Sequence, residues 1–366
     1  MSSDRIKILV MAAGTGGHVF PALSIASLLM SQSVQVEWLG TPRGMENQLL
    51  TDTGIPLHKV SVSGLRGAGL VRKILAPFML AKAFFQSLLV ILKVRPTCVL
   101  GMGGFVSGPA GVAAKVLGKP LFIHEQNAVA GLTNRLLSNL ADQVFEAYPN
   151  TFARSVRPIF TGNPLRTKIV RVKKEFKTKD KSALRLLVLG GSRGALSINS
   201  VIPEFLSNSS ATKDIRLLHQ TGHESFAKTL EKYESQGISF GERFRVLPFI
   251  EEVSEAYAWA DLVISRSGAS TVSELAAIGL PSILIPYPYH SDNQQLLNAK
   301  WLVDEKAAIL IQQADLNVQT LKEAVRPFMT DKSRLQDMAV NARRVGIRDA
   351  AQKIAHFCIK ASYENK

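Results

Sequence analysis

The sequence predicts an α/β protein of two domains, each with a parallel sheet covered by helices on both faces. Its 366 residues are too many for one ordinary domain and suit two. Short apolar runs alternate with glycine-rich turns and helix-period segments, as in parallel sheets. A Lys-dense stretch, residues 166–183, interrupts this pattern and is poor in core residues. We therefore expect domains at 1–165 and 184–340, a basic linker at 166–183, and a C-terminal helix within 341–366 that could pack back on the first domain.

The strand–turn–helix unit occurs four times, twice in each half. The predicted strands are Ile6–Met11, Thr97–Leu100, Leu186–Leu189 and Leu262–Ser265. The turns after them begin at Gly14, Gly101, Gly190 and Ser267, and the helices run to Leu28, to about Leu117, toward Leu206 and through Ala277. In parallel sheets, ligands bind beyond the carboxyl ends of the strands, where these turns lie.

The glycine turns suggest a phosphate ligand, because glycine lets backbone N–H groups approach an anion and a helix N-terminus favours negative charge. Any single turn could instead serve only to reverse the chain, but four at strand ends favour ligand binding. A P-loop is excluded at Gly14–Val19, which lacks Gly-Lys-Ser/Thr. A dinucleotide fingerprint would need glycine at Val19, so NAD binding is only weakly supported.

The net charge of +15 invites nucleic acid, anionic lipid or phosphorylated substrates. The excess is uneven: residues 1–165 carry +8, residues 166–183 carry +6, and residues 184–366 carry +1. Nucleic acid is disfavoured because 3 Trp and 6 Tyr offer no aromatic-rich basic platform. Two cysteines, Cys98 and Cys358, allow no disulfide framework or CxxC zinc site and favour a reducing compartment. The first residues are typical of a strand and lack the features of a signal peptide.

Three polar positions are candidates for chemistry. His18 lies close to the start of the first helix, whose dipole disfavours the protonated imidazole, so it suits a general base or only a turn hydrogen bond. Glu274 could accept bonds from a ribose, or close a capping box with Thr271. Gln294 and Gln295 could bind sugar hydroxyls or simply lie on a helix surface. His290 with Asp292 is too little for a metal site, and no Asp-x-Asp pair occurs, so we expect no metal.

The stretch Ile74–Leu92 is nearly long enough for a membrane span, which needs about 20 apolar residues. Lys82, Gln86 and Ser87 interrupt it and it leads directly into a predicted strand, so we reject a span. Two alternatives remain: a helix packed in the core, or one whose outer apolar face dips into a bilayer surface. The surrounding cations favour anionic lipid. The residues of this expected membrane patch are Lys73, Ile74, Leu75, Phe78, Lys82, Phe84 and Phe85.

Seven segments carry a more specific signal. They are Ala13–Ala22 (AGTGGHVFPA), Gly101–Pro109 (GMGGFVSGP), His124–Ala128 (HEQNA), Thr161–Arg166 (TGNPLR), Gly190–Ala195 (GGSRGA), His219–Gly222 (HQTG) and Arg266–Glu274 (RSGASTVSE). Together they resemble the MurG family of bacterial glycosyltransferases, with the match running from about Ile6 to about Ala308.

The resemblance implies a glycosyltransferase B fold, in which two Rossmann-like domains with parallel sheets face a central cleft. It implies inverting transfer of N-acetylglucosamine from UDP-N-acetylglucosamine to the 4-hydroxyl of undecaprenyl-pyrophosphoryl-MurNAc-pentapeptide, which converts lipid I to lipid II. Neither a cofactor nor a metal is expected. The implied location is peripheral, on the cytoplasmic face of the bacterial inner membrane. The implied partners are both substrates, an anionic membrane surface and other cell-wall synthesis proteins, with no nucleic acid.

Site roles carry over by motif position. His18 would be the base. The acceptor would meet Gly14, Gly103, Gly104, Phe105 and Glu125. The UDP-sugar would meet Thr15, Gly16, Gly17, Asn127, Arg166, Ser192, Ile250, Ala269, Ser270, Thr271, Val272, Ser273, Glu274, Gln294 and Gln295. Two residues depart from the family pattern: Ala13 replaces a common glycine, which matters little if its φ is negative, and Arg193 replaces an expected glutamine.

Three other functions share part of these features. A lipid-directed transferase that glycosylates diacylglycerol would have the same fold and membrane face. A sugar-nucleotide epimerase would share the UDP cleft but would need no apolar patch near Ile74–Phe85. A nucleic-acid-binding protein would use the positive charge but lacks the aromatic platform.

Overall fold

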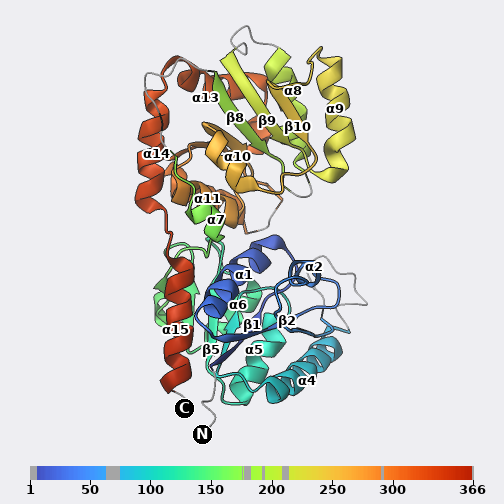
Figure 1. Cartoon of the computed structure of the whole chain (residues 1–366), viewed down its shortest axis with the longest axis vertical. Helices are drawn as coiled ribbons and strands as arrows, with labels where there is room; N and C mark the ends of the chain where they lie inside the picture. Colours follow the sequence, from blue (N-terminus) through green and yellow to red (C-terminus); the bar gives the residue numbers. More distant parts are fainter. Residues whose placement is uncertain are drawn as a thin grey trace. The chain divides into compact units, whose positions relative to one another are not determined.

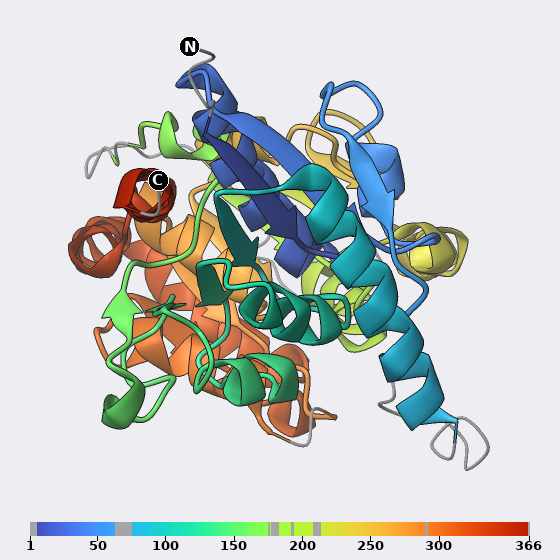
Figure 2. The same cartoon turned by 90° about the horizontal axis from the view of Figure 1, so that it is seen from below.

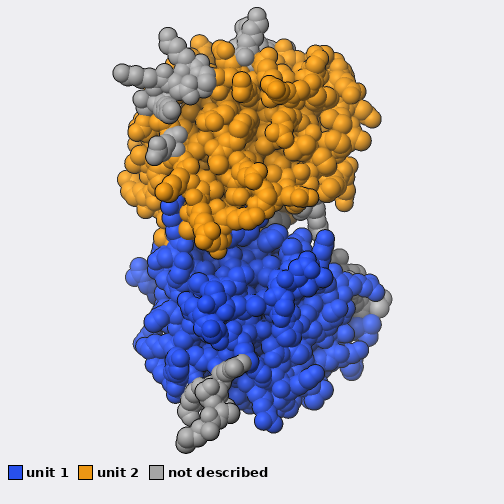
Figure 3. Space-filling model, in the orientation of Figure 1, with its two compact units in different colours: residues 1–166, 348–366 blue, residues 167–347 orange. Residues whose placement is uncertain are grey.

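The computed structural model describes residues 6–62, 75–174, 176, 183–191, 194–207, 214–289 and 292–364. The chain divides into two compact units (Figure 3). Unit 1 comprises Met1–Arg166 and Arg348–Lys366, and unit 2 comprises Thr167–Ile347. Each unit is an α/β fold around one parallel sheet (Figure 1).

Unit 1 contains a seven-stranded sheet in the order β3-β2-β1-β4-β5-β6-β7, with every neighbouring pair parallel. The strands are β1 Lys7–Met11, β2 Gln35–Gly40, β3 Leu57–Lys59, β4 Cys98–Gly101, β5 Leu121–Glu125, β6 Gln143–Glu146 and β7 Ile159–Phe160. The helices are α1 Gly16–Ser31, α2 Glu46–Leu49, α4 Ala76–Val94, α5 Ser107–Val116, α6 Leu132–Leu137 and α15 Ala350–Glu364, with a 3-10 turn at Arg154–Val156.

Alternating side chains of β1 divide the core of unit 1 into two layers. Ile8 and Val10 pack with residues of α1 and α15, such as Ile25 and Ile354. Leu9 and Met11 face the opposite layer, whose residues come from α4, α5 and α6. In Figure 2 the red helix α15 and the long blue-green helix α4 lie on opposite sides of the strands. This burial on both faces explains why the strands are continuous apolar runs.

The helix α15 joins the start and the end of the chain in one core. Cys358 lies beside Cys98 of β4, and both are buried thiols without a disulfide. The Cys358 side chain hydrogen-bonds Cys98 and, with burial, raises the Cys98 pKa well above its usual value. Thr97 donates a hydrogen bond to the Ser362 hydroxyl at 2.8 Å. These contacts attach the C-terminal helix to unit 1.

Unit 2 contains a six-stranded parallel sheet in the order β10-β9-β8-β11-β12-β13. The strands are β8 Leu184–Leu189, β9 Ile215–Gln220, β10 Phe244–Leu247, β11 Leu262–Ser265, β12 Ser282–Leu284 and β13 Ala308–Leu310. The helices are α7 Thr167–Val170, α8 Leu196–Ser207, α9 Phe226–Ser235, α10 Val253–Trp259, α11 Ala269–Ile278, α12 Gln294–Val303, α13 Val318–Thr330 and α14 Ser333–Val345, with 3-10 turns at His223–Ser225 and Gln313–Asp315.

The four predicted strand–turn–helix units are confirmed, as β1–α1, β4–α5, β8–α8 and β11–α11. β1 and β4 are central in the sheet of unit 1, and β8 and β11 are central in that of unit 2. When the strands of each unit are numbered along the chain, both sheets have the order 3-2-1-4-5-6 from one edge. This is the Rossmann order, in which the chain reverses its direction of travel across the sheet between strands 1 and 4.

Residues 167–174, which the sequence suggested as part of a linker, fold into unit 2. The helix α7 packs against α11 and buries Ile169. Lys174 is buried too, with its Nζ 3.4 Å from a carboxylate oxygen of Asp261 and donating to the Ala258 carbonyl at 3.0 Å. Burial lowers the Lys174 pKa to about 8. The basic composition of this stretch therefore did not reveal that Lys174 is buried in unit 2.

Candidate active site

The four glycine turns all lie at the carboxyl ends of the central strands β1, β4, β8 and β11. In each unit these are the two strands between which the order reverses. Ligands of open α/β sheets bind at this switch point. The geometry of each unit therefore marks the edge where a ligand is expected.

In unit 1, the turns after β1 and β4 touch each other. Gly104 has φ +82°, and a Cβ added to it would lie 2.6 Å from the Ala13 carbonyl oxygen. Gly103 has φ +89°, and its Cβ would lie 2.9 Å from the His18 ring. The Ser107 hydroxyl closes the second turn by donating to the Gly103 carbonyl at 2.7 Å. Only glycine fits at these two positions, so both are needed for the approach of the two turns.

His18 lies in the first turn of α1, as predicted, and its backbone N–H donates to the Thr15 carbonyl at 3.1 Å. Its Nε2 is directed at the Gly103 turn, whereas Nδ1 is buried and without a hydrogen-bond partner in the described part of the chain. Burial lowers the His18 pKa, and the negative charge of Glu125 partly opposes this shift. The neutral imidazole expected of a general base is thus favoured, chiefly by burial.

Glu125, at the end of β5, is buried and accepts four hydrogen bonds within the fold. One oxygen accepts from the Asn127 backbone and side-chain nitrogens at 3.0 and 3.1 Å. The other accepts from the Gly131 backbone at 3.0 Å and from the Asn134 side chain at 2.9 Å. The carboxylate therefore shapes the loop that carries Asn127 and adds negative charge near His18. Its predicted contact with an acceptor stays a prediction.

A second buried carboxylate, Glu46 of α2, was not recognised from the sequence. It accepts from the Thr41 backbone N–H at 2.7 Å, the Thr41 hydroxyl at 2.9 Å and the Gly14 N–H at 3.2 Å. A Cβ on Gly44 would collide with this carboxylate. Glu46 thus attaches the first glycine turn to the segment after β2. The one local feature of the sequence that points to this contact is Gly44, which lies two residues before Glu46 in the segment RGMEN.

The other unit 1 candidates surround these turns. Gly14 and Thr15 are exposed at the end of β1, and Thr15 is the N-cap residue of α1. Ala13 has a negative φ, so its replacement of glycine causes no strain. Phe105 is half-exposed immediately after Gly104. Arg166 is partly exposed, with its guanidinium 5.3 Å from the centre of the Phe20 ring.

In unit 2, the first turn of α11 is the main candidate. Gly268, in an extended conformation, is the N-cap residue, and the Val272 N–H is bonded to the Gly268 carbonyl at 3.0 Å. The capping box proposed for Thr271 and Glu274 is therefore wrong, because Thr271 is already the third helical residue. Glu274 is buried and accepts a hydrogen bond from the Tyr257 hydroxyl at 2.9 Å. The first-turn residues Ala269, Ser270 and Thr271 present a helix N-terminus, which attracts anions.

The paired glutamines begin α12 but differ in their surroundings. The Gln295 side chain accepts from the Tyr287 N–H at 2.9 Å, so it helps to fix the preceding loop. Gln294 is partly exposed, and no described side chain pairs with it, which makes it the better candidate for a sugar contact. Ile250 is partly exposed after β10. Ser192, Arg193 and His290 lie outside the described residues.

Arg266 is a structural residue that the sequence did not single out for a role. Its guanidinium donates to the Ile285 carbonyl at 3.1 Å, the Ser197 hydroxyl at 2.9 Å and the Gln313 side chain at 2.6 Å. Burial lowers its pKa. It thereby joins the ends of β11 and β12 to α8 directly before the α11 turn.

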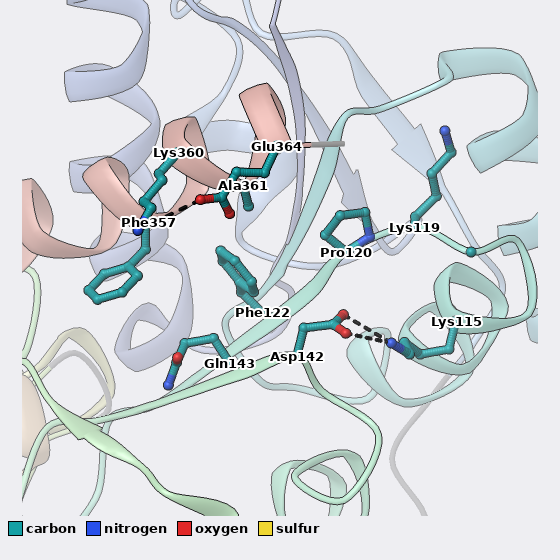
Figure 4. A pocket seen from close by; sticks show the side chains of 11 residues that line it. Lys115, Lys119, Pro120, Phe122, Asp142, Gln143, Phe357, Lys360, Ala361 and Glu364 are labelled. Carbon is teal, nitrogen blue, oxygen red and sulfur yellow. Dashed lines mark hydrogen bonds and ion pairs between the residues drawn. The ribbon is translucent and has the colours of Figure 1, made fainter. Parts of the chain in front are cut away.

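A pocket of about 390 Å³ in unit 1 lies away from these turns. Pro120 and Asp142, which line it, precede β5 and β6, so the pocket lies at the amino ends of the strands (Figure 4). Its charges are largely paired, Lys115 with Asp142 at 2.8 Å and Lys360 with Glu364 at 3.7 Å. It is therefore not the candidate active site. Among the described residues, no cluster of His, Cys, Asp and Glu could hold a metal ion.

Comparisons with known proteins agree with this geometry. The chain matches the glycosyltransferase family 28 N-terminal domain over residues 8–146 and the family 28 C-terminal domain over residues 185–354. A relative from Azotobacter vinelandii is 44% identical over 97% of this chain and 99% of its own length. One from Shewanella oneidensis is 46% identical over 98% of both chains. Both are named UDP-N-acetylglucosamine–N-acetylmuramyl-(pentapeptide) pyrophosphoryl-undecaprenol N-acetylglucosamine transferase.

Two of the solved structures that are similar to the chain differ in how much they show about it. The crystal structure of Acinetobacter baumannii MurG is 38% identical and aligns over 97% of this chain and 99% of its own, with a TM-score of 0.81. A crystal structure of a Listeria monocytogenes protein, named there a putative UDP-N-acetylglucosamine 2-epimerase, aligns over 98% of this chain and 97% of its own with a TM-score of 0.68. At 17% identity this likeness shows the shared fold alone.

Two Rossmann-like units, each with a parallel sheet and glycine turns at its switch point, match the B fold of glycosyltransferases, and the sequence relatives place the chain in that class. Within that class, the chain belongs to glycosyltransferase family 28. The family resemblance drawn from the seven motifs is confirmed, and the facing of the two domains across a cleft stays a prediction.

Proposed function

We propose that this chain transfers N-acetylglucosamine from UDP-N-acetylglucosamine to undecaprenyl-pyrophosphoryl-MurNAc-pentapeptide, the reaction in its relatives' names. The observation that carries the proposal is His18, a histidine of lowered pKa in the first turn of α1, with Nε2 at the Gly103 turn. A base at this switch point matches transfer to a hydroxyl group.

The base acts on the acceptor. As the 4-hydroxyl oxygen attacks C1 of the donor sugar, its proton passes to the neutral His18 imidazole. The C1–O bond to UDP breaks on the opposite face, and its electron pair leaves with the β-phosphate, so the configuration at C1 inverts. The negative charge of Glu125 near His18 stabilises the imidazolium that forms. No covalent sugar–enzyme intermediate is required, and hence no second carboxylate nucleophile.

The departing diphosphate needs positive potential. We assign this role to backbone N–H groups at the N-terminus of α11, because they are oriented before the reaction begins. We assign the donor sugar and nucleotide to α11, Ile250 and Gln294 in unit 2. Glu274 remains our candidate for the ribose hydroxyls, with its carboxylate held by Tyr257.

The membrane contact that we propose rests on α4. One stripe of this helix, including Ala83, Ser87 and Ile91, is buried against unit 1. The opposite stripe is also apolar yet exposed: Phe78 is 75% exposed, Phe85 62% and Leu89 65%. A helix that packs on one face and exposes several large apolar side chains beside a lysine, Lys82, on the other suits an anionic bilayer surface. Of the predicted patch, Phe84 instead packs against the core, and Lys73 and Ile74 lie outside the described residues.

Exposed apolar side chains also occur on α5, which packs against α4, and on α6, which packs against α5. They are Val116, Leu132 and Leu136. Residues 53–124, which include α4 and α5, contain nine Lys and Arg and no Asp or Glu, so these two helices can approach anionic lipid without repulsion. Within the described chain, α4 is the one helix whose length and composition would allow it to cross a membrane. Because its buried stripe packs on unit 1, we propose that it lies on the surface, as a peripheral contact at the cytoplasmic face of the bacterial inner membrane.

A single assay tests the proposed reaction. The protein is given radiolabelled UDP-N-acetylglucosamine and lipid-linked muramyl-pentapeptide, and the lipid phase is extracted. We expect label in the lipid phase that depends on the acceptor. Label that stays water-soluble, or that enters diacylglycerol but not the muramyl lipid, would contradict the proposal.

A further inference from the structure

Gln126 is a buried side chain of unit 1 to which neither the sequence nor the family motif gave a role. It follows β5 and is 1% exposed. Its Nε2 donates to the Met102 carbonyl at 3.0 Å, and that carbonyl lies at the start of the second glycine turn. Because a carbonyl can only accept, this bond fixes which end of the amide is the nitrogen.

The neighbouring His124 fixes the amide a second time. Its Nε2 is 3.0 Å from the Gly162 carbonyl, so Nε2 carries the proton and Nδ1 is an acceptor. Nδ1 lies 3.0 Å from the Gln126 Nε2, which donates to it. Burial lowers the His124 pKa to about 4, in keeping with a neutral ring. The hydrogen bonds therefore run in one direction, from Gln126 to His124 and from His124 to Gly162.

This arrangement leaves the amide oxygen of Gln126 without a donor. Oε1 is buried and has no hydrogen-bond partner among the residues that the structure describes. It is 3.6 Å from the point where a Cβ of Gly103 would lie, and His18 Nε2 is 3.1 Å from the same point. A Cβ there would meet both side chains, so the unpaired acceptor and the candidate base are both close neighbours of Gly103. A buried acceptor that stays unpaired is costly, and a ligand donor would satisfy it.

We infer that Gln126 is a further acceptor-binding residue, whose amide oxygen accepts a hydrogen bond from a second donor group of the acceptor sugar. The inference rests on the proposed function. The second donor must differ from the 4-hydroxyl, because one O–H cannot donate to both His18 and Gln126. The neighbouring 6-hydroxyl and the amide N–H groups of the acceptor are the donors of suitable chemistry. By holding one of them, Gln126 would orient the sugar so that its 4-hydroxyl faces His18.

The test combines a variant with acceptor analogues. Wild type and Gln126→Met are assayed with the full acceptor, with its 6-deoxy analogue and with analogues methylated at each amide nitrogen. For wild type, we expect one analogue to lose about 10-fold or more in kcat/KM. For Gln126→Met, kcat/KM for the full acceptor should fall by a similar factor. The same analogue should then have no lower kcat/KM than the full acceptor, and KM for UDP-N-acetylglucosamine should stay the same.

Non-additivity separates binding from a merely structural role. If every analogue lowers kcat/KM by the same factor in variant and wild type, the oxygen holds only water or supports the loop, and the inference is overturned. If Gln126→Met does not fold, Gln126→Asn retains both polar groups but withdraws the oxygen by one methylene, and the same comparison is made with it. A wild-type protein that glycosylates no muramyl lipid would refute the proposed function itself; one that does so but tolerates every analogue would refute only the role of Gln126.

Discussion

The two units share a strand order but differ in what they place at the switch point. In unit 1, the turns adjoin a group that can take up a proton and one that can accept a hydrogen bond: His18, with a buried Nδ1, and Gln126, with a buried Oε1, neither atom having a partner among the described residues. In unit 2, the hydroxyls of Ser265 and Ser270 at the switch point are also without a partner among the described residues, but the buried histidine and the arginine there are satisfied. His219 is held between Tyr233 and Asn199 at 2.8 and 3.1 Å, and Arg266 donates in three directions.

This difference teaches that the common scaffold determines where a ligand lies, and the side chains determine what happens to it. Unit 1 places a histidine nitrogen and an amide oxygen without partners where proton transfer is proposed, whereas unit 2 places serine hydroxyls and a helix N-terminus there, which are suited to holding an anion. Both features follow from the same strand–turn–helix unit. A substitution in one unit should therefore affect only the part of the reaction assigned to that unit.

The largest effect is expected for His18→Ala. Loss of a general base typically lowers kcat by 10²–10⁴-fold, while the affinity for UDP-N-acetylglucosamine, assigned to unit 2, should remain within about 2-fold. Steady-state kinetics together with calorimetric titration of the donor measure both quantities. A variant that keeps near-normal kcat would remove His18 from its role as base.

Gly104→Ala should disrupt the contact between the two turns of unit 1. The new Cβ would lie 2.6 Å from the Ala13 carbonyl oxygen at φ +82°, and backbone strain of this kind costs about 1–3 kcal/mol. Gly54→Ala is the matched control, since Gly54 also has a positive φ (+72°) but no atom near the added Cβ. We expect a clear fall in acceptor kcat/KM for the first variant only. Equal losses of activity would mean that the contact has no role in the site.

Glu274→Gln should weaken donor binding by about 10-fold, because a carboxylate accepts stronger hydrogen bonds than an amide. The amide can still accept from Tyr257, so the melting temperature should change little. Tyr257→Phe serves as the control for the internal bond alone. Normal donor affinity combined with a lowered melting temperature would leave Glu274 with a structural role only.

The smallest effect on catalysis is expected for Phe85→Asp on α4. An exposed carboxylate in this stripe should reduce binding to anionic vesicles by about 10-fold, while activity on a detergent-solubilised acceptor stays the same. Val340→Asp, at a similarly exposed apolar position of unit 2, provides the matched control. Vesicle flotation at low and high salt measures binding. Equal flotation of both variants would exclude α4 as the contact surface.

The sequence was informative wherever a local pattern determines the structure. The four strands, their glycine turns and the position of His18 could be predicted, because continuous apolar runs and turn chemistry are local properties. The capping box at Thr271 failed since the extended Gly268 starts the helix earlier. Glu46 and Gln126 could not be assigned contacts, because Glu46 lies 32 residues from Gly14 and Gln126 lies 24 residues from Met102. Likewise, only packing distinguishes Phe84, which is partly buried, from Phe85, which is exposed.

The central claim, that unit 1 supplies a neutral histidine base, is tested most directly by the pH dependence of kcat/KM. Burial lowers the His18 pKa from 6.5, so activity should persist below pH 6.5 and then fall as the imidazole becomes protonated at lower pH. In His18→Gln the residual activity should lack this acidic inflection. An inflection that stays at the same pH in His18→Gln would contradict the claim, because another group would then be the base.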